Sequence, residues 1–400
     1  DALTDGGRLS NSPGLLLQLA ELGWLGVSLP AEYGGGGAGM VEECIFLEET
    51  ARGQAPIHAY GTGLTAAQTY LRHGTEEQKK EVLGNLCAGR FEAIALSEPG
   101  AGSDLGSVRT RAVRDGDRFI VNGQKIWITA AHLADHLLVL TRTSTDGPKH
   151  KGLTLLYLTT DTPGLEIKPI ETMDGHTVNE VFFTDVAVPA ANVVGGVGDA
   201  WHRLMRGLNV ERLIIAAMSI GAARRSVEDT IAYVKQREQF GRSLGSFQAV
   251  RHRLADLVAE IDCCRAYVYQ VAAQIDAGLE DQLAREGSIA KLKCTEIAKQ
   301  AALEGVQLMG GNGYTVEYGM ELQVRKALAP PIYGGANEVQ RDIIGKDDDD
   351  IGALVGRAAG RGRRARQQGG AKGQPAGPQA HQPQQDVRWW QACAMCLWQV

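Results

Sequence analysis

Four short segments of the sequence combine glycines with polar or aromatic side chains in a way that suits ligand binding. In residues 97–104 the glycines let backbone amides approach a ligand closely, and the serine hydroxyls can donate to it. Residues 127–129, Trp-Ile-Thr, place an aromatic face beside a hydroxyl donor. Two later segments add other groups. Residues 237–241 with Gln248 supply an arginine that can pair with phosphate, amide side chains and a glycine, and residues 307–313 supply amide side chains and further glycines. Taken singly, each segment is better explained as a turn or a helix cap.

Hydrophobic periodicity predicts the elements that must position these segments. Over residues 15–89 apolar side chains recur every three or four positions, which is typical of amphipathic helices. Residues 92–188 change to short alternating runs and predict an antiparallel β domain. Over residues 201–309 the helical period returns in long stretches, and long paired helices indicate a bundle.

Within the β region one dipeptide predicts a specific turn. The apolar runs 119–121 and 125–128 flank Asn122-Gly123, and Asn-Gly between two such runs is a strong signal for a two-residue hairpin. We therefore expect two strands joined at Asn122-Gly123. Further strands are expected at residues 137–140, 153–158 and 181–183.

These patterns predict an α+β multidomain chain. The expected divisions are an N-terminal helical domain at residues 1–91, a middle antiparallel β domain at 92–198, a C-terminal four-helix bundle at 199–345 and a low-complexity tail at 346–400. Residues 356–386 contain no Ile, Leu, Val, Met or aromatic side chain and cannot bury enough apolar surface to fold. The tail is therefore expected to be disordered.

Composition argues against several classes of function. The net charge of −6 disfavours a nucleic-acid-binding protein, and no run approaches the roughly 20 apolar residues of a membrane span. Seven cysteines without a repeating spacing do not make a disulfide framework, so we expect a reducing, cytoplasmic location. No spacing predicts a metal site strongly. The glycines at residues 34–39 formally fit a dinucleotide-binding turn, but any glycine run does, and no repeated strand–helix units follow.

In combination and in order, five motifs resemble those of the acyl-CoA dehydrogenase family. They are Ser-Glu-Pro-Gly-Ala-Gly-Ser-Asp at 97–104, Asn-Gly-Gln-Lys-Ile-Trp-Ile-Thr at 122–129, Arg-Glu-Gln-Phe-Gly-Arg at 237–242, Gln-Leu-Met-Gly-Gly-Asn-Gly-Tyr at 307–314 and Ile-Tyr-Gly-Gly-Ala-Asn-Glu-Val-Gln-Arg at 332–341. The resemblance spans about residues 15–345. It implies the family's order of helical, β and helical-bundle domains, which agrees with the periodicity.

The resemblance implies FAD bound between the β domain and the bundle. The residues that it implies along the flavin are Ile94, Leu96, Ser97, Gly102, Ser103, Trp127, Ile128 and Thr129, with the Ser97 and Thr129 hydroxyls near the reactive ring edge. Those implied at the adenine and pyrophosphate end are Arg237, Phe240, Gln248, Gln307, Gly310 and Gly311. They would serve an FAD held mainly by a neighbouring subunit, so a homotetramer or dimer of dimers is expected. Ala336 stands where many members carry a Thr facing the FAD, and Glu338 at a position that usually contacts the cofactor.

The family's reaction takes a proton from the carbon next to a thioester while hydride leaves the β-carbon for the flavin. A carboxylate in a closed apolar pocket suits the proton transfer, because desolvation raises its pKa toward the working pH. Many relatives carry this base as the Glu of Ile-Tyr-Glu-Gly-Thr, but this chain has Gly334 there. In a branch with long-chain and isovaleryl-type enzymes, a bundle helix supplies the carboxylate from a motif resembling Leu-Asn-Val-Glu-Arg-Leu at 208–213. The resemblance therefore implies Glu211 as the base, whereas the helical pattern alone favours a surface or ion-paired residue.

Other roles follow from the same resemblance. Gly334 would donate its amide to the thioester carbonyl, and the residues implied to contact or position substrate are Ser103, Asn209, Arg212 and Gly335. The implied activity is FAD-dependent dehydrogenation of an acyl-CoA to a trans-2-enoyl-CoA, with electrons passed to an electron-transfer flavoprotein. An oxygen-dependent acyl-CoA oxidase of the same fold and a non-catalytic subunit of a mixed tetramer remain open. The acyl group is expected to be medium-to-long or branched.

Two departures from the family pattern are expected to matter. The sequence begins near the family's second helix, so the first N-terminal helix is expected to be missing, and after Gly345 the tail replaces a short helical end. A truncated or frame-shifted chain would explain both.

Overall fold

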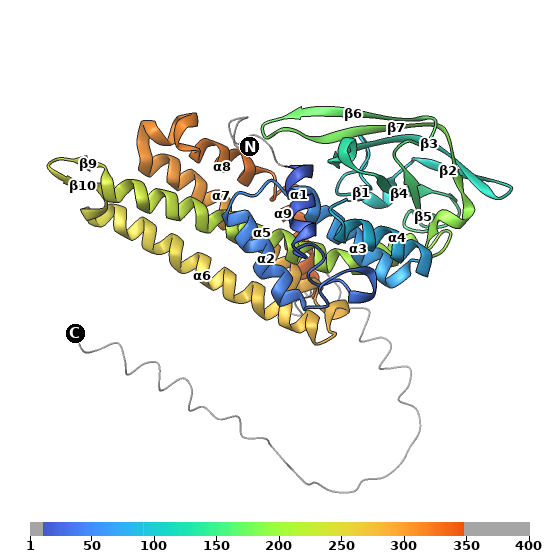
Figure 1. Cartoon of the computed structure of the whole chain (residues 1–400), viewed down its shortest axis with the longest axis horizontal. Helices are drawn as coiled ribbons and strands as arrows, with labels where there is room; N and C mark the ends of the chain where they lie inside the picture. Colours follow the sequence, from blue (N-terminus) through green and yellow to red (C-terminus); the bar gives the residue numbers. More distant parts are fainter. Residues whose placement is uncertain (1–10, 91, 348–400) are drawn as a thin grey trace, which may run out of the picture. The chain divides into compact units, whose positions relative to one another are not determined.

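The computed structural model describes residues 11–90 and 92–347. The disorder expected for residues 346–400 concerns a segment that lies almost wholly outside the described residues. Within the described part, short helices come first, a sheet follows and long helices come last (Figure 1). This order confirms the fold class that the periodicity predicted.

The first helices begin and end where local sequence allows. They are α1 (Pro13–Glu21), α2 (Met40–Arg52), α3 (His58–His73) and α4 (Glu76–Cys87). Ser12 caps α1 by accepting a hydrogen bond from the Leu15 amide, and Thr75 and Gln78 cap α4 reciprocally. The glycines at residues 34–39 lead into α2, whose N-terminal amides Met40 N and Val41 N donate to the Asp276 carboxylate at 2.5 and 3.1 Å. A carboxylate of this chain thus occupies the place that a phosphate would take in a dinucleotide-binding turn.

A mostly antiparallel sheet follows the first helices. Its strands are β1 (Glu92–Ala95), β2 (Arg111–Asp115), β3 (Arg118–Thr129), β4 (His136–Arg142), β5 (Leu153–Thr159), β6 (Leu165–Thr172), β7 (Gly175–Pro189) and β8 (Val193–Val194). They pair in the order β6-β7-β3-β2-β4-β5-β8, with β1 beside β4. The strands expected at residues 137–140, 153–158 and 181–183 are confirmed. The expected antiparallel domain is confirmed in its main part, with two parallel exceptions: β1 pairs in parallel with β4, and β2 and β4 share one parallel pair.

The hairpin expected at Asn122-Gly123 is wrong. β3 runs unbroken through both residues, and the turn between β2 and β3 lies earlier, at Gly116 with φ +62°. The Asn122 amide instead bonds across to β7: its Nδ2 donates to Asp185 Oδ1 at 3.0 Å, and its Oδ1 accepts from Asp185 N at 2.9 Å. Gly123 is required by a close approach, since an ideal Cβ there would lie 2.6 Å from Thr110 Oγ1. Long-range contacts therefore override the local turn signal.

Long helices form the last part of the described chain. They are α5 (Ala200–Gln236), α6 (Gln248–Asp276) and α7 (Ala284–Met309), with the shorter α8 (Met320–Leu328) and α9 (Asn337–Asp347) packed on α7. A small hairpin, β9 (Glu238–Gln239) and β10 (Arg242–Ser243), joins α5 to α6 at the end of these helices away from the large sheet (Figure 1). None of the helices within 11–90 and 92–347 is both long and apolar enough to cross a bilayer.

One buried carboxylate joins three helices of this assembly. Glu48 of α2 accepts from Arg224 of α5 and from two groups of α6, Arg265 Nε at 2.7 Å and Tyr269 Oη at 2.5 Å. Glu48 is 2 % exposed, so its charge is stabilised mainly by these donors. The first helices and the long helices therefore share one core around α5.

Candidate active site

Glu211 of α5 faces the loop between α8 and α9 that carries Gly334. An ideal Cβ built on Gly334 would lie 3.8 Å from Glu211 Oε1 and 2.3 Å from Cδ1 of Ile215, one helical turn further along α5. Gly334 has φ +62°, which a residue with a side chain adopts only at a cost. Position 211 of α5 and position 334 of the loop are therefore neighbours, and it is the helix that supplies a carboxyl group there.

The surroundings of Glu211 favour a carboxyl group that can accept a proton. The side chain is only partly accessible to solvent, and burial raises the pKa of Glu211, while the charges of Arg212 and Lys291 act in the opposite direction. A carboxyl group whose pKa is raised by desolvation, with cations nearby to limit the rise, is suited to general base catalysis near neutral pH.

Lys291 of α7 holds the glycine loop beside Glu211. It is fully buried, and its Nζ donates to Gly335 O and to Asn337 Oδ1, both at 2.9 Å. Burial lowers the pKa of Lys291 to about 8, and the negative charges of Glu211 and Glu338 oppose this. The ammonium group thus fixes the loop and places positive charge near Glu211. We did not identify Lys291 from the sequence; its only signal was a charged residue on the apolar face of a helix.

Gln340 in α9 holds the same loop from the other side. Its Nε2 donates to Gly334 O at 3.1 Å and to Gly335 O at 2.8 Å. An ideal Cβ on Gly335 would lie 2.6 Å from that nitrogen, and Gly335 has φ +80°, so a side chain there would be strained and would displace the Gln340 amide. Asn337 adds a third anchor by donating from Nδ2 to Thr295 Oγ1 at 3.1 Å. With both glycine carbonyls held, the orientation of the loop peptides is fixed.

Tyr333 connects the loop to the N-terminal helices. Its ring meets the ring of His58 in α3 edge to face, with the ring centres 5.9 Å apart at 71°. Burial raises the pKa of Tyr333, and the charges of Asp174 and Glu211 add to this rise. Tyr333 thus lies between α3 and the Glu211 carboxyl group, whose charge acts on it.

Asn209 and Arg212, which were expected to contact substrate, are buried and bond to each other. Arg212 Nη1 donates to Asn209 Oδ1 at 2.7 Å, and Asn209 Nδ2 donates to Glu280 O at 2.9 Å. Within the described part of the chain, Arg212 Nε has no hydrogen-bond partner. The pair therefore ties α5 to the turn before α7, and its contact with substrate stays a prediction.

The segments expected along a flavin come together where β1 and β3 lie side by side. Ile126 N donates to Ser97 O at 3.0 Å. Trp127 has φ +63° and is 58 % exposed, so much of its side chain is available to a ligand. Ile94, Leu96, Ser97 and Thr129 are partly buried, Ile128 is buried, and Gly102 and Ser103 are exposed.

A buried ion pair supports this segment, and we did not identify it from the sequence. Lys125, which is fully buried in β3, donates from Nζ to Leu96 O and to Glu98 Oε1, both at 2.8 Å. Glu98 also accepts from the amides of Arg109 at 2.6 Å and Thr110 at 2.8 Å. The backbone at Leu96 is thus held in place by a buried ammonium group.

The residues expected at the adenine end lie far from Glu211. Phe240 is 94 % exposed at the tip of the β9–β10 hairpin, and the rest of this group is exposed too: Arg237, Gln248, Gln307, Gly310 and Gly311. Asn312 Nδ2 donates to Tyr233 Oη at 2.9 Å and brings the end of α7 to the same end of α5. Along α5, Glu211 and Arg237 are separated by about 39 Å at 1.5 Å per residue. One chain therefore does not bring the two groups of residues together.

The remaining expected residues lie at the start of α9: Ala336 directly precedes the helix, and Glu338 is in its first turn. Ala336 is partly buried, and Glu338 is exposed and paired with Arg341 at 3.4 Å.

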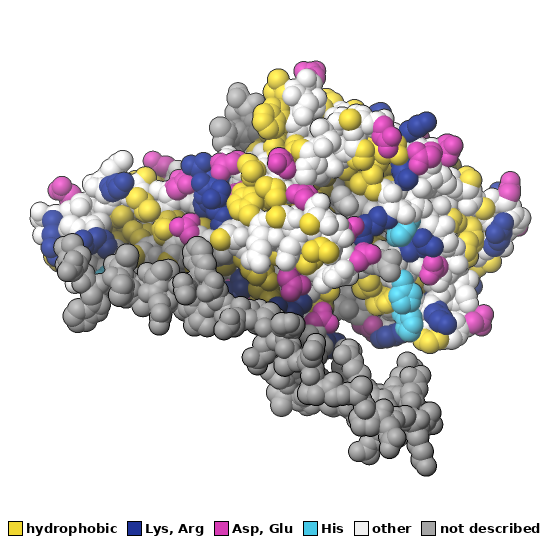
Figure 2. Space-filling view, turned by 90° about the horizontal axis from the view of Figure 1, so that it is seen from below, with side chains coloured by type: hydrophobic (Ala, Val, Ile, Leu, Met, Phe, Trp, Pro, Cys, Tyr) yellow, Lys and Arg dark blue, Asp and Glu magenta, His cyan; other side chains and the backbone are white. Residues whose placement is uncertain are grey.

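On the face drawn in Figure 2, acidic and basic side chains are interspersed. Among residues 11–90 and 92–347, no group of three or more His, Cys, Asp or Glu side chains is arranged to hold a metal ion.

Comparisons with known proteins cover all of these parts. The sequence models of the N-terminal, middle and C-terminal domains of acyl-CoA dehydrogenase match residues 7–90, 93–186 and 198–347. An acyl-CoA dehydrogenase of Bacillus subtilis is 36% identical over 338 residues, which are 83% of this chain and 88% of the relative. The mitochondrial isovaleryl-CoA dehydrogenase of Pongo abelii is 36% identical over 336 residues, 82% of this chain and 79% of the relative. The crystal structure of acyl-CoA dehydrogenase from Geobacillus kaustophilus matches with a TM-score of 0.81 and 36% identity, over 87% of this chain and 93% of that one.

Proposed function

The chain belongs to the acyl-CoA dehydrogenase family of oxidoreductases, whose cofactor is FAD, and on this premise we propose that it converts an acyl-CoA thioester to the trans-2-enoyl-CoA. We further propose that its electrons pass to an electron-transfer flavoprotein. The observation that carries the proposal is the approach of Glu211 to Gly334: Glu211 Oε1 lies 3.8 Å from the position of an ideal Cβ on Gly334, so α5 brings a carboxyl group to a loop that has none there.

In the proposed reaction Glu211 takes the proton from the α-carbon of the substrate. Burial raises the pKa of Glu211, so its carboxylate is a stronger base than one in water. The cations Arg212 and Lys291 limit that rise, which favours the ionised form that accepts the proton. Bound FAD supplies the acceptor for the hydride that leaves the β-carbon.

The glycine loop stabilises the charge that develops on the thioester oxygen. We assign the donor to the amide of Gly334, and Lys291 and Gln340 hold the carbonyls of Gly334 and Gly335. A donor whose orientation is fixed before the reaction needs no reorganisation as charge develops. Gly335, Ser103, Asn209 and Arg212 are proposed to contact or position the substrate.

The cofactor is proposed to span two subunits. Residues 94–103 and 127–129 would hold the flavin of one FAD, whereas the exposed group around Phe240 would hold the adenine end of an FAD in a neighbouring subunit. The distance of about 39 Å along α5 between Glu211 and Arg237 supports this division. A homotetramer or a dimer of dimers provides it, and a cytoplasmic location stays a prediction.

The acyl group is proposed to be medium-to-long or branched. The small residues Gly334, Gly335 and Ala336 beside the base are compatible with a large or branched acyl group. One relative is named for isovaleryl-CoA, a branched thioester, which supports the branched alternative.

The test is the absorbance of the flavin in the purified full chain, measured without oxygen before and after addition of a panel of acyl-CoAs. We expect wild type to bleach with at least one of them and Glu211→Gln to bleach at least a hundredfold more slowly. Glu228→Gln is the matched control, because Glu228 lies on the same helix and pairs with Arg52 at the surface. Equal bleaching by wild type and Glu211→Gln would eliminate Glu211 as the base.

The same preparation separates the two alternatives. Rapid peroxide formation in air without an added acceptor would indicate an acyl-CoA oxidase. Absence of flavin from the isolated chain, with recovery after co-expression with a related subunit, would indicate a non-catalytic partner in a mixed tetramer.

A further inference from the structure

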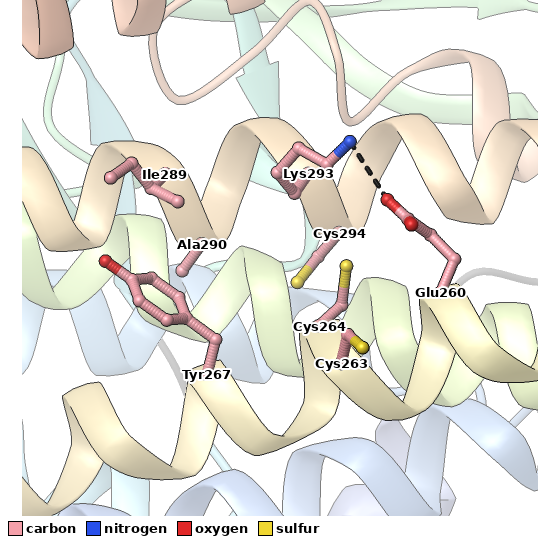
Figure 3. A pocket seen from close by; sticks show the side chains of 8 residues that line it. All are labelled: Glu260, Cys263, Cys264, Tyr267, Ile289, Ala290, Lys293 and Cys294. Carbon is pink, nitrogen blue, oxygen red and sulfur yellow. Dashed lines mark ion pairs between the residues drawn. The ribbon is translucent and has the colours of Figure 1, made fainter. Parts of the chain in front are cut away.

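A hollow between α6 and α7 is lined by three thiols. Its volume is about 170 Å³, and its walls include Cys263 and Cys264 of α6 and Cys294 of α7. Figure 3 shows that the sulfur atoms of Cys264 and Cys294 point toward each other from the two helices, whereas that of Cys263 points away. Glu260 and Lys293 form an ion pair of 2.9 Å at one side of the hollow.

The two facing thiols differ in exposure and in acidity. Cys294 is 1 % exposed and Cys264 is 7 % exposed at the wall of the hollow. A hydrogen bond from Cys294 lowers the pKa of Cys264 and the charge of Lys293 adds to this, whereas burial and Glu260 act in the opposite direction. A thiol with a lowered pKa that lines a hollow and stands beside a second thiol can be oxidised and then resolved into a disulfide by that neighbour.

We propose that Cys264 and Cys294 form a thiol-oxidation site, at which a hydroperoxide converts the pair into a disulfide bond between α6 and α7. The thiolate of Cys264 attacks one peroxide oxygen, the O–O bond breaks, and the sulfur becomes a sulfenic acid while the other oxygen leaves with a proton as water or alcohol. The sulfur of Cys294 then attacks that of Cys264, the S–S bond forms, and the hydroxyl group leaves as water with the proton of Cys294. The two sulfurs lose two electrons and the peroxide gains two.

The site is close to the part of α7 that holds the glycine loop. Cys294 is one turn from Lys291 and adjacent to Thr295, and both of these contact Asn337. The proposed disulfide would therefore join α6 to the turn of α7 that positions the active-site loop. The proposal concerns only two thiols and the packing of two helices, so it does not rest on the proposed function.

The test is peptide mapping of the full chain after treatment with hydrogen peroxide. Free thiols are alkylated, the protein is digested with trypsin without reduction, and the peptides are weighed. We expect residues 254–265, alkylated once at Cys263, linked to residues 294–299, with a mass about 2 Da below the sum of these two peptides because two hydrogens are lost. Since Cys263 and Cys264 share one peptide, Cys263→Ser is the control that must keep the link.

Variants at the two proposed positions decide the result. Cys264→Ala and Cys294→Ala should each lower the yield of the linked peptide at least tenfold, and their thermal unfolding in the reduced state verifies that they fold. A link that survives in Cys264→Ala but is lost in Cys263→Ser would overturn the proposal. So would a link from Cys294 to Cys44, a buried thiol of α2, or full alkylation of both cysteines after peroxide has oxidised the exposed Cys263.

Discussion

The carboxyl group of Glu211 lies beside the place where a side chain at Gly334 would begin: an ideal Cβ on Gly334 would be in van der Waals contact with Glu211 Oε1, at 3.8 Å. The base and the loop therefore cannot be altered independently. Any side chain at position 334 enters the space beside the carboxyl group and meets Ile215 at 2.3 Å.

Gly334→Ala should destabilise the protein and slow substrate oxidation. The positive φ costs about 1–2 kcal/mol for a residue with a Cβ, and the contact with Ile215 adds about 1–3 kcal/mol of overpacking. Gly278→Ala is the matched control, because Gly278 has φ +79° but nothing within 4 Å of its ideal Cβ. Denaturant unfolding of both variants measures the difference, and equal losses of stability would disprove the crowding at Gly334.

Lys291→Met should shift the acid limb of the pH profile of kcat/KM to higher pH. Removing the ammonium group removes a charge that lowers the pKa of Glu211, so the base requires a higher pH to ionise. Arg212 and Tyr333 remain beside the carboxyl group in the variant. Lys293→Met, at an exposed lysine two residues further along α7, should leave the limb in place. An unchanged acid limb in Lys291→Met would show that the charge of Lys291 does not act on the base and that the residue has only a structural role.

Lys125→Met should destabilise the protein by about 3–5 kcal/mol, because it leaves the carboxylate of Glu98 buried without its partner. It should also weaken retention of FAD, since Lys125 holds Leu96 O. The double variant Lys125→Met/Glu98→Gln should recover part of the stability by removing the unpaired charge. Lys168→Met breaks an exposed pair with Glu166 and should cost at most about 1 kcal/mol. Thermal unfolding and the ratio of FAD to protein after gel filtration measure both effects.

Glu92→Gln should change how stability depends on pH. Burial raises the pKa of Glu92 to about 8, and its carboxyl group accepts a hydrogen bond from Tyr70. The folded state therefore binds a proton that the unfolded state releases above about pH 4.5, so wild type loses up to about 1.4 kcal/mol per pH unit from this group between pH 4.5 and 8. Gln stays neutral and can still accept from Tyr70. The variant should thus become more stable than wild type toward pH 8 in denaturant unfolding, and parallel curves for the two proteins would contradict the assignment.

The order of elements could be predicted from the sequence because it depends on periodicity. The apolar repeats in α5 and α7 and the continuous apolar runs of β4 and β5 are strong local signals. Asn122-Gly123 shows where local signals fail: its preference for a turn is outweighed by the bonds of Asn122 to Asp185 and the close approach of Gly123 to Thr110. No pattern within a few residues reveals such partners.

Residues of the candidate site could be predicted where they belong to a sequence motif. Residues that support the site only through packing could not be predicted. The resemblance pointed to Glu211 and Gly334, and the structure places them together. Lys291 and Lys125 were missed because a single lysine in an amphipathic element is usually exposed. Their burial depends on carbonyl and carboxylate groups that lie 27 to 46 residues away in sequence.

The length of α5 has a genetic consequence. Glu211 lies near one end of this helix and Arg237 at the other. In the proposed assembly each subunit therefore supplies the base of its own active site and also binding residues for the FAD of its neighbour. A chain damaged at Glu211 and a chain damaged at Arg237 would then repair each other when mixed, because some sites would combine an intact base with an intact neighbouring hairpin. Two inactive alleles expressed together would yield partial activity.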